Sequence, residues 1–374
     1  MEGGSEGARP RKRDIRRGGR LACLSRRRKD IGPRQFPQLY PCRAGPTFLF
    51  GVTGREEGGT MGRMIHVGTC SWNDRSIASG GFYPPSVKSA EGRLRYYARV
   101  FDTVEIDATF YAIVSPENAF LWQKRTPAGF VFHAKAYGCL TGHAVDVRSV
   151  PSALRAHLSA EGGPSGRVLI RDEGMLRDLS RLFLESLSPL ARAGKLGLIV
   201  FQFPPWFAFS AANRCRIVQR RALMEGHAVG VEFRHSSWLS PERAKDVLAF
   251  LRSEGITYVV CDEPQCGTQT APFLPATTAD VAYFRFHGRN AQAWLKKGAG
   301  TSARYDYLYS DEELASFVPA LRDADASAKE VYAMFNNCHA GKAMINSRRL
   351  RDILRTQGLP VAEGFREEDG ALWF

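Results

Sequence analysis

The sequence predicts an α/β fold, a TIM-like (β/α)8 barrel, from three observations. From Ile65 onward, short β-rich runs alternate with helical patterns, which is typical of parallel βα units. Eight such strands can be identified, and eight is the number that closes this barrel. The roughly 310 residues after the first 60 accommodate one barrel of about 250 residues with insertions.

The predicted strands are runs rich in Val, Ile, Phe and Tyr, separated by helical patterns. The strands lie near residues 65–71, 103–110, 130–136, 196–203, 228–234, 257–262, 281–287 and 330–336. The helices lie near residues 87–100, 116–125, 175–192, 212–224, 241–254, 311–322 and 347–356. Ser115-Pro116 and Ser240-Pro241 are typical helix starts, because Ser caps the first turn and Pro fits its geometry.

Two gaps between the elements are irregular. The gap between strands 3 and 4, residues 137–195, is too long for one crossover, so we expect residues 138–173 to be an insertion over one end of the barrel. Residues 263–280 are rich in Pro and Thr, and we expect them to contain only a short helix.

The first 60 residues differ in composition from the remainder. They contain 14 Lys and Arg against six Asp and Glu, so +8 of the total charge of +14 lies there and +6 remains for the other 314 residues. Without hydrophobic periodicity, residues 1–60 are predicted to be a disordered basic extension. A nucleic-acid-binding arm and an Arg-rich transit peptide are open alternatives. We prefer the interpretation that translation starts at Met61 or Met64, with residues 61–374 forming a single barrel domain.

Composition also bears on the compartment. Eight cysteines are scattered without a CxxC pair, which favours reduced thiols over a disulfide framework. No run of about 18 apolar residues occurs, so no membrane span is predicted. We therefore expect a cytoplasmic protein, while these features predict nothing about its oligomeric state.

Alternating polarity along the strands places polar side chains inside the barrel. Glu105 and Asp107 share a face opposite Val104 and Ile106, and because apolar faces meet the outer helices, polar faces point inward. Unpaired charges there cost several kcal/mol each, so a paired structural network is one interpretation. We prefer a functional site, because the charges gather at the carboxyl ends of the strands. The inward polar set is Glu105, Asp107, His133, Lys135, Gln202, Glu232, Arg234, Asp262, Arg285, His287 and Arg289.

Residue type assigns a role to each candidate. Glu105 and Glu232 are candidates for general acid and base, Lys135 for base, Schiff-base amine or counter-ion, and His287 for proton shuttle or metal ligand. Candidate substrate-binding residues are Trp72, Asp107, Tyr111, Gln202, Arg234, Trp238, Asp262, Arg289, Asn336 and Asn337. Among these, the arginines suit a carboxylate or phosphate, and each Trp is equally consistent with barrel packing. No Gly-rich phosphate motif precedes a helix, so no nucleotide cofactor is predicted, but His287 and the acidic residues leave room for one divalent metal.

Several blocks of the sequence are similar, in order, to those of one known family. They lie at residues 68–72, 82–85, 101–106, 109–111, 195–197, 201–205, 232–238, 286–289, 305–307 and 335–337, with Asn346 beyond them. Over about residues 65–357 the chain resembles the YecE-like family, known as domain of unknown function 72. The resemblance implies a TIM-like barrel and no established activity. The chain differs at Asp107 and Ala108, where Asn and Ser are common, at residues 141–143 and at residues 338–340.

Three functions remain open at this point. The preferred hypothesis is an enzyme with an acid–base site that acts on a small anionic or sugar-like substrate. A nucleic-acid-binding or metal-assisted phosphodiesterase barrel is the first alternative, and its expected mark is a basic stripe beside the barrel mouth. A non-catalytic barrel that binds a metabolite or a partner is the second.

Overall fold

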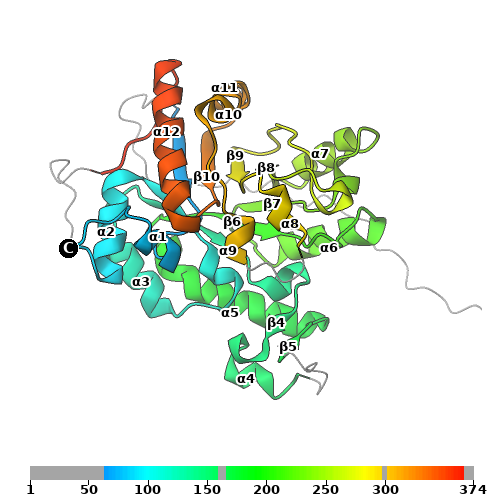
Figure 1. Cartoon of the computed structure of the whole chain (residues 1–374). Helices are drawn as coiled ribbons and strands as arrows, with labels where there is room; N and C mark the ends of the chain where they lie inside the picture. Colours follow the sequence, from blue (N-terminus) through cyan, green and yellow to red (C-terminus); the bar gives the residue numbers. More distant parts are fainter. Residues whose placement is uncertain (1–62, 159–165, 297–300, 366–374) are drawn as a thin grey trace, which may run out of the picture. The chain divides into compact units, whose positions relative to one another are not determined.

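The structure is a computed structural model that describes residues 63–158, 166–296 and 301–365, so the predicted N-terminal extension lies outside the described residues. Eight parallel strands form a closed barrel in the order β1, β2, β3, β6, β7, β8, β9 and β10 (Figure 1), which confirms the predicted fold. The strands are β1 (Ile65–Thr69), β2 (Thr103–Ile106), β3 (Val131–Lys135), β6 (Leu196–Gln202), β7 (Val229–Glu232), β8 (Thr257–Asp262), β9 (Val281–Phe286) and β10 (Glu330–Phe335).

Helices connect the strands, and most agree with the predicted ranges. The longer helices are α2 (Ala90–Val100), α3 (Pro116–Lys124), α5 (Glu173–Arg192), α6 (Ala211–Ala222), α7 (Ala244–Ser253), α11 (Val318–Ser327) and α12 (Lys342–Thr356). The shorter ones are α1 (Arg75–Ser79), α8 (Ala291–Trp294), α9 (Thr301–Arg304) and α10 (Asp311–Ala315). As predicted, the Ser115 hydroxyl caps α3 by accepting a hydrogen bond from the Asn118 amide.

Several predicted helix ranges were wrong in detail: α2 begins at Ala90 rather than near residue 87, and α12 begins at Lys342 rather than near residue 347. Helix α7 begins at Ala244 rather than at Pro241, because the residues after Ser240 form a turn whose amides at Arg243 and Ala244 both donate to the Ser240 carbonyl. The helix predicted over 311–322 is divided into α10 and α11, and Pro319 lies in the first turn of α11, where its missing amide is tolerated.

The insertion between β3 and α5 is present. It contains the antiparallel pair β4 (Val145–Asp146) and β5 (Arg167–Val168) and the short helix α4 (Ser152–Arg155). In Figure 1 these elements lie together beside α5. The other irregular gap contains, between β8 and β9, the 3-10 turn Gly267–Gln269, as expected for a short helix.

The barrel interior changes from apolar to polar along the strands. Leu198, Val259, Tyr283, Tyr332 and Met334 pack together inside the barrel as a cluster separate from the main core between strands and helices. The same cluster includes Val200 and Cys261, and beyond it the inward positions toward the carboxyl ends of the strands include the buried polar side chains of Gln202 and Arg285, as the alternation predicted. This polar layer positions the candidate site at the carboxyl ends of the strands.

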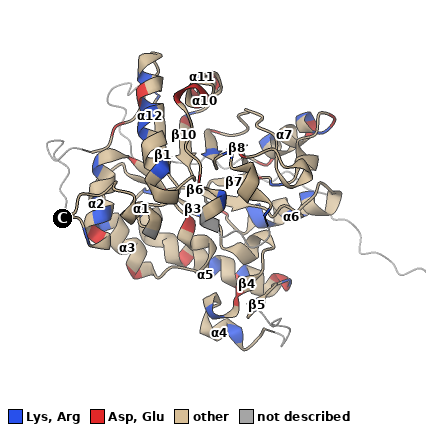
Figure 2. Cartoon of the chain, viewed as in Figure 1, with Lys and Arg blue, Asp and Glu red and all other residues tan. Residues whose placement is uncertain are grey.

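Figure 2 shows acidic and basic residues interspersed along the outer helices. Among the described residues, no helix is both long enough and apolar enough to cross a membrane.

Candidate functional site

The centre of the polar layer is Arg285, whose side chain extends inward from β9 and lies between a carboxylate from β2 and a carboxylate from β7. Its guanidinium donates one hydrogen bond to Glu105 Oε1 on β2 at 2.7 Å and another to Glu232 Oε2 on β7. All three side chains are 0% exposed. A buried charge is tolerated only when it is paired and hydrogen-bonded, and the two carboxylates satisfy this condition for Arg285.

The chain of alternating charges continues from Glu232. Its Oε1 accepts hydrogen bonds from Arg234 Nη1 at 2.8 Å and from Gln202 Nε2 at 2.5 Å. Arg234 Nε lies 2.9 Å from Oε2 of the buried Glu263, the residue after β8. The sequence placed these charges on one face but did not predict their pairing, and it missed Glu263.

The three carboxyl groups of this network differ in pKa. Burial raises the pKa of Glu105 despite the nearby Arg285. Burial also acts to raise the pKa of Glu232, but the charge of Arg285 and the adjacent His287 hold it well below its usual range. Burial raises the pKa of Glu263 to about 7. Carboxyl groups with separated pKa values are the arrangement from which acid and base roles arise.

His287 is uncharged at neutral pH, because burial lowers its pKa to about 3. Its Nδ1 lies 2.9 Å from the side-chain amide of Asn336. Its Nε2 lies 3.2 Å from Glu232 Oε1, an acceptor, and 3.3 Å from Arg234 Nη1, a donor. His287 therefore links the Asn336 amide to the charged network.

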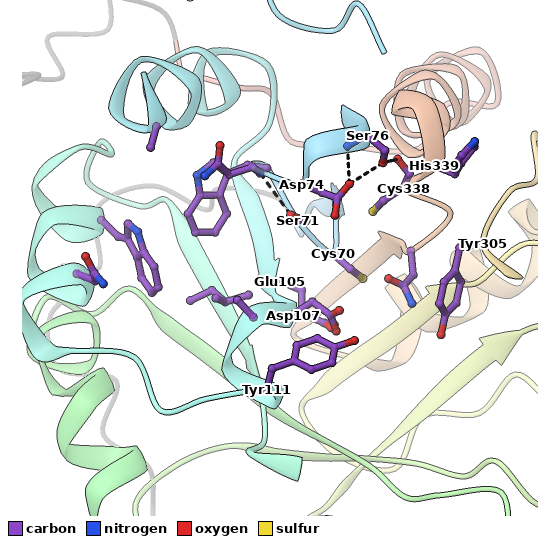
Figure 3. A pocket seen from close by; sticks show the side chains of 18 of the residues that line it. Cys70, Ser71, Asp74, Ser76, Glu105, Asp107, Tyr111, Tyr305, Cys338 and His339 are labelled. Carbon is purple, nitrogen blue, oxygen red and sulfur yellow. Dashed lines mark hydrogen bonds between the residues drawn. The ribbon is translucent and has the colours of Figure 1, made fainter. Parts of the chain in front are cut away.

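A cavity of about 640 Å³ opens over this layer beside β1, β2 and β10. Of the predicted site residues, those that line it are Trp72, Glu105, Asp107, Tyr111 and Asn336. In Figure 3 the Glu105 and Asp107 carboxyl groups point into the cavity, with the Tyr111 and Tyr305 rings at its border. The cavity thus combines carboxyl groups, an amide and aromatic walls.

Lys135 lies next to this cavity and serves as a counter-ion. Its Nζ is 2.9 Å from Asp107 Oδ1 and 4.5 Å from the centroid of the Phe110 ring. Burial acts to lower the Lys135 pKa, but the charge of Asp107, the hydrogen bond to Asp107 and the nearby Tyr305 together raise it. A lysine held protonated cannot act as a base or as a Schiff-base amine, so of its three predicted roles the counter-ion role is the one that this geometry favours.

The remaining predicted site residues lie outside the cavity lining. Arg289 pairs with Asp262 and with Glu313 through separate nitrogens. Trp238 is buried, stacks on Phe233 and donates its indole N–H to a backbone carbonyl, so it packs the core. The other predicted site residues that do not line the cavity are Gln202, Glu232, Arg234, His287 and Asn337.

Several lining residues escaped the sequence reasoning. Tyr305 and Trp122 border the cavity from a loop and from α3, where strand alternation carries no signal. Cys70 and Cys338 also line it, and burial raises the pKa of both thiols, so neither is an activated nucleophile. The family resemblance was the available signal, because Cys70 and Tyr305 lie in its blocks at residues 68–72 and 305–307.

One group of side chains has metal-ligand types close together: Glu232, Cys261 and His287, whose ligand atoms lie within 4.8 Å of one another. This donor set does not fit a divalent ion well. Both Glu232 oxygens are already bound by arginines, and burial raises the pKa of the Cys261 thiol well above its usual value. A cation there would also lie beside two guanidinium groups.

Comparison with known proteins identifies the family. Residues 66–368 match the family model described as protein of unknown function DUF72. The chain belongs to the DUF72 family. It is 33% identical over 295 residues to the UPF0759 protein YunF of Bacillus subtilis, covering 78% of this chain and 95% of YunF. This confirms the family predicted from the sequence blocks.

Solved structures of DUF72 family proteins share the barrel. One from Enterococcus faecalis superposes with a TM-score of 0.65 at 27% identity, covering 81% of this chain and 99% of that one. Another from Thermotoga maritima has a TM-score of 0.62 at 31% identity, covering 78% of this chain and 100% of that one.

Proposed function

We propose that this DUF72 protein is an enzyme that performs acid–base chemistry on a small sugar-like molecule bound in the 640 Å³ cavity. The observation that carries the proposal is Glu105, a buried carboxyl group with a raised pKa that lines this cavity. Glu105 accepts hydrogen bonds from Arg285 and from the Tyr283 hydroxyl, yet burial still raises its pKa, so it takes up a proton more readily than an ordinary glutamate, as a general acid requires. Asp107, whose carboxylate is paired with Lys135, lies two residues away on the same lining and supplies the charged partner.

The choice of a sugar-like ligand over an anion follows from the arginines. Arg285 contacts two carboxylates, Arg234 contacts two, and Arg289 contacts two. An anionic substrate would have to displace one of these partners. The cavity itself offers carboxyl, hydroxyl and amide groups between aromatic walls, which suits a neutral ring with several hydroxyl groups. The same pairing of the arginines gives a phosphodiester substrate little support.

Ligand binding tests this proposal directly. The full chain is titrated with a panel of neutral monosaccharides, glycosides and polyols and, in parallel, with sugar phosphates, and binding is followed by ligand-detected NMR and by thermal shift. We expect at least one neutral member to bind and Tyr111→Ala to weaken that binding about tenfold or more. Tyr111 is 56% exposed, so its loss leaves the fold intact.

Phe120→Ala on α3 is the matched control, because Phe120 is 49% exposed and does not line the cavity. It should leave binding unchanged. If no neutral member binds, if only the phosphates bind, or if Tyr111→Ala and Phe120→Ala behave alike, the proposal is wrong.

A further inference from the structure

A second cavity of about 350 Å³ lies at the same end of the barrel. It is formed by the loop after β6, the start of α6 and the insertion, and its floor is apolar, with Phe203, Phe207 and Leu140 among its residues. Trp206 stands at its border and is 68% exposed, the largest exposed fraction among the large hydrophobic residues of the described chain. An indole so exposed, next to a cavity, provides a flat apolar face for a ligand ring.

Ring contacts connect this cavity with the first one. Tyr111, which lines the first cavity, has its ring centroid 5.2 Å from that of Phe110. Phe110 lies 5.0 Å from His143, and His143 lies 5.7 Å from Trp206. Burial lowers the pKa of His143 to about 4, so its ring is neutral at neutral pH and behaves as an aromatic surface. These four residues, which we call the aromatic track, run from one cavity to the other.

The two ends of the aromatic track differ in charge. The first cavity is lined by Asp74, Glu105 and Asp107 and by a single arginine, Arg125. The second is lined by Arg171, Arg216 and Arg220 against one carboxylate, Glu173, which is paired with Arg220. Arg171 and Arg216 are exposed, so an anionic group can reach them without displacing a buried partner. The second cavity therefore complements a negative charge, and the first does not.

From this arrangement we infer that the two cavities are subsites of one elongated binding surface, and that the ligand is an acidic oligosaccharide. One neutral unit occupies the first cavity beside Tyr111, following units cross the aromatic track, whose rings meet edge to face, one unit stacks on the exposed ring of Trp206, and a unit with a carboxylate reaches Arg171 and Arg216. The inference rests on the proposed function and names its substrate class. A ligand of one ring cannot fill both cavities, because the two cavities have no lining residue in common and the rings of Phe110 and His143 connect Tyr111 with Trp206.

The test compares ligand lengths. Neutral gluco-oligosaccharides and xylo-oligosaccharides carrying one glucuronic acid, each of one to six units, are titrated into the full chain by isothermal titration calorimetry. We expect the affinity to rise at least about tenfold between ligands of one and four units, and acidic oligosaccharides to bind more tightly than neutral ones of the same length. Trp206→Ala should remove the gain with length while leaving the monosaccharide affinity unchanged, and Arg171→Ala with Arg216→Ala should remove the preference for acidic ligands. Phe120→Ala again serves as the exposed aromatic control.

The outcomes separate this inference from the proposed function. Monosaccharide binding without any gain with length, or a gain that survives Trp206→Ala, overturns the inference alone. No binding at any length overturns the proposed function as well. A single-stranded oligonucleotide is tested in parallel. If it binds more tightly than every saccharide and this binding depends on Trp206, the aromatic track binds a different polymer and the inference is overturned.

Discussion

Substitution of Glu232 by Gln is expected to cost about 3–5 kcal/mol in the free energy of unfolding, the range for removing one partner of a buried ion pair. The Glu232 carboxylate is 0% exposed and contacts Arg285, Arg234 at 2.8 Å and Gln202 at 2.5 Å. A glutamine amide keeps one acceptor oxygen and turns its NH2 group toward another donor. Arg285 and Arg234 would then each retain a single carboxylate, Glu105 and Glu263 respectively.

The assay is urea denaturation of the full chain followed by far-UV circular dichroism, with the melting temperature as a second readout. At roughly 2–4 °C per kcal/mol for a domain of this size, the Tm should fall by about 6–20 °C. Glu173→Gln is the matched control. Glu173 also pairs with an arginine through both oxygens, at 2.7 and 2.8 Å, but its side chain is 58% exposed, so the expected loss is about 1 kcal/mol or less. Equal losses in the two variants would refute the idea that burial makes the network costly to break.

Three further predictions concern the stability of the barrel. Burial lowers the pKa of His133 to about 3, so between pH 6.5 and 3 the unfolded chain binds a proton that the folded chain does not. The free energy of unfolding should therefore fall as the pH falls. His133→Gln should reduce this pH dependence by about 1.4 kcal/mol per pH unit, as measured by urea denaturation from pH 6.5 to 4.5. An equal pH dependence in the wild type and the variant would contradict the prediction. Trp238→Phe should cost about 1 kcal/mol, because it removes the hydrogen bond to the Phe207 carbonyl, and should leave ligand titrations unchanged. Gly230→Ala should lower the free energy of unfolding by about 1–3 kcal/mol, because the added Cβ would lie 2.6 Å from Leu198 Cδ2 inside the barrel. An unchanged denaturation midpoint would contradict this and show that the interior side chains shift to accept the methyl group.

Much of the fold could be predicted from the sequence. The alternation of side chains along a strand is a local pattern, and the number of strands determines whether a parallel sheet closes into a barrel. Alternation along β2 and β9 placed Glu105 and Arg285 inside, and the structure agrees. Alternation says nothing about which inward charges are close enough to pair. It therefore did not reveal that Arg285 bridges Glu105 and Glu232, or that Arg234 also contacts Glu263.

The position of the cavity was less predictable, because loops define it. Tyr305 and Trp122 reach the mouth from outside the strands, and the insertion brings His143 against Trp206. Trp238 was equally consistent with binding and with packing, since an aromatic residue after a strand end suits both, and in the structure it is buried and stacks on Phe233. Residue type alone does not separate the two uses.

The central claim is that Glu105 acts as the acid on a sugar-like ligand in the first cavity. Its most direct test is a time course by proton NMR, in which the bound neutral saccharide is incubated with the wild-type chain and with Glu105→Gln. We predict that the wild type converts the ligand, and that Glu105→Gln still binds it but converts it at least about 100-fold more slowly. Conversion by Glu105→Gln at the wild-type rate would contradict the claim.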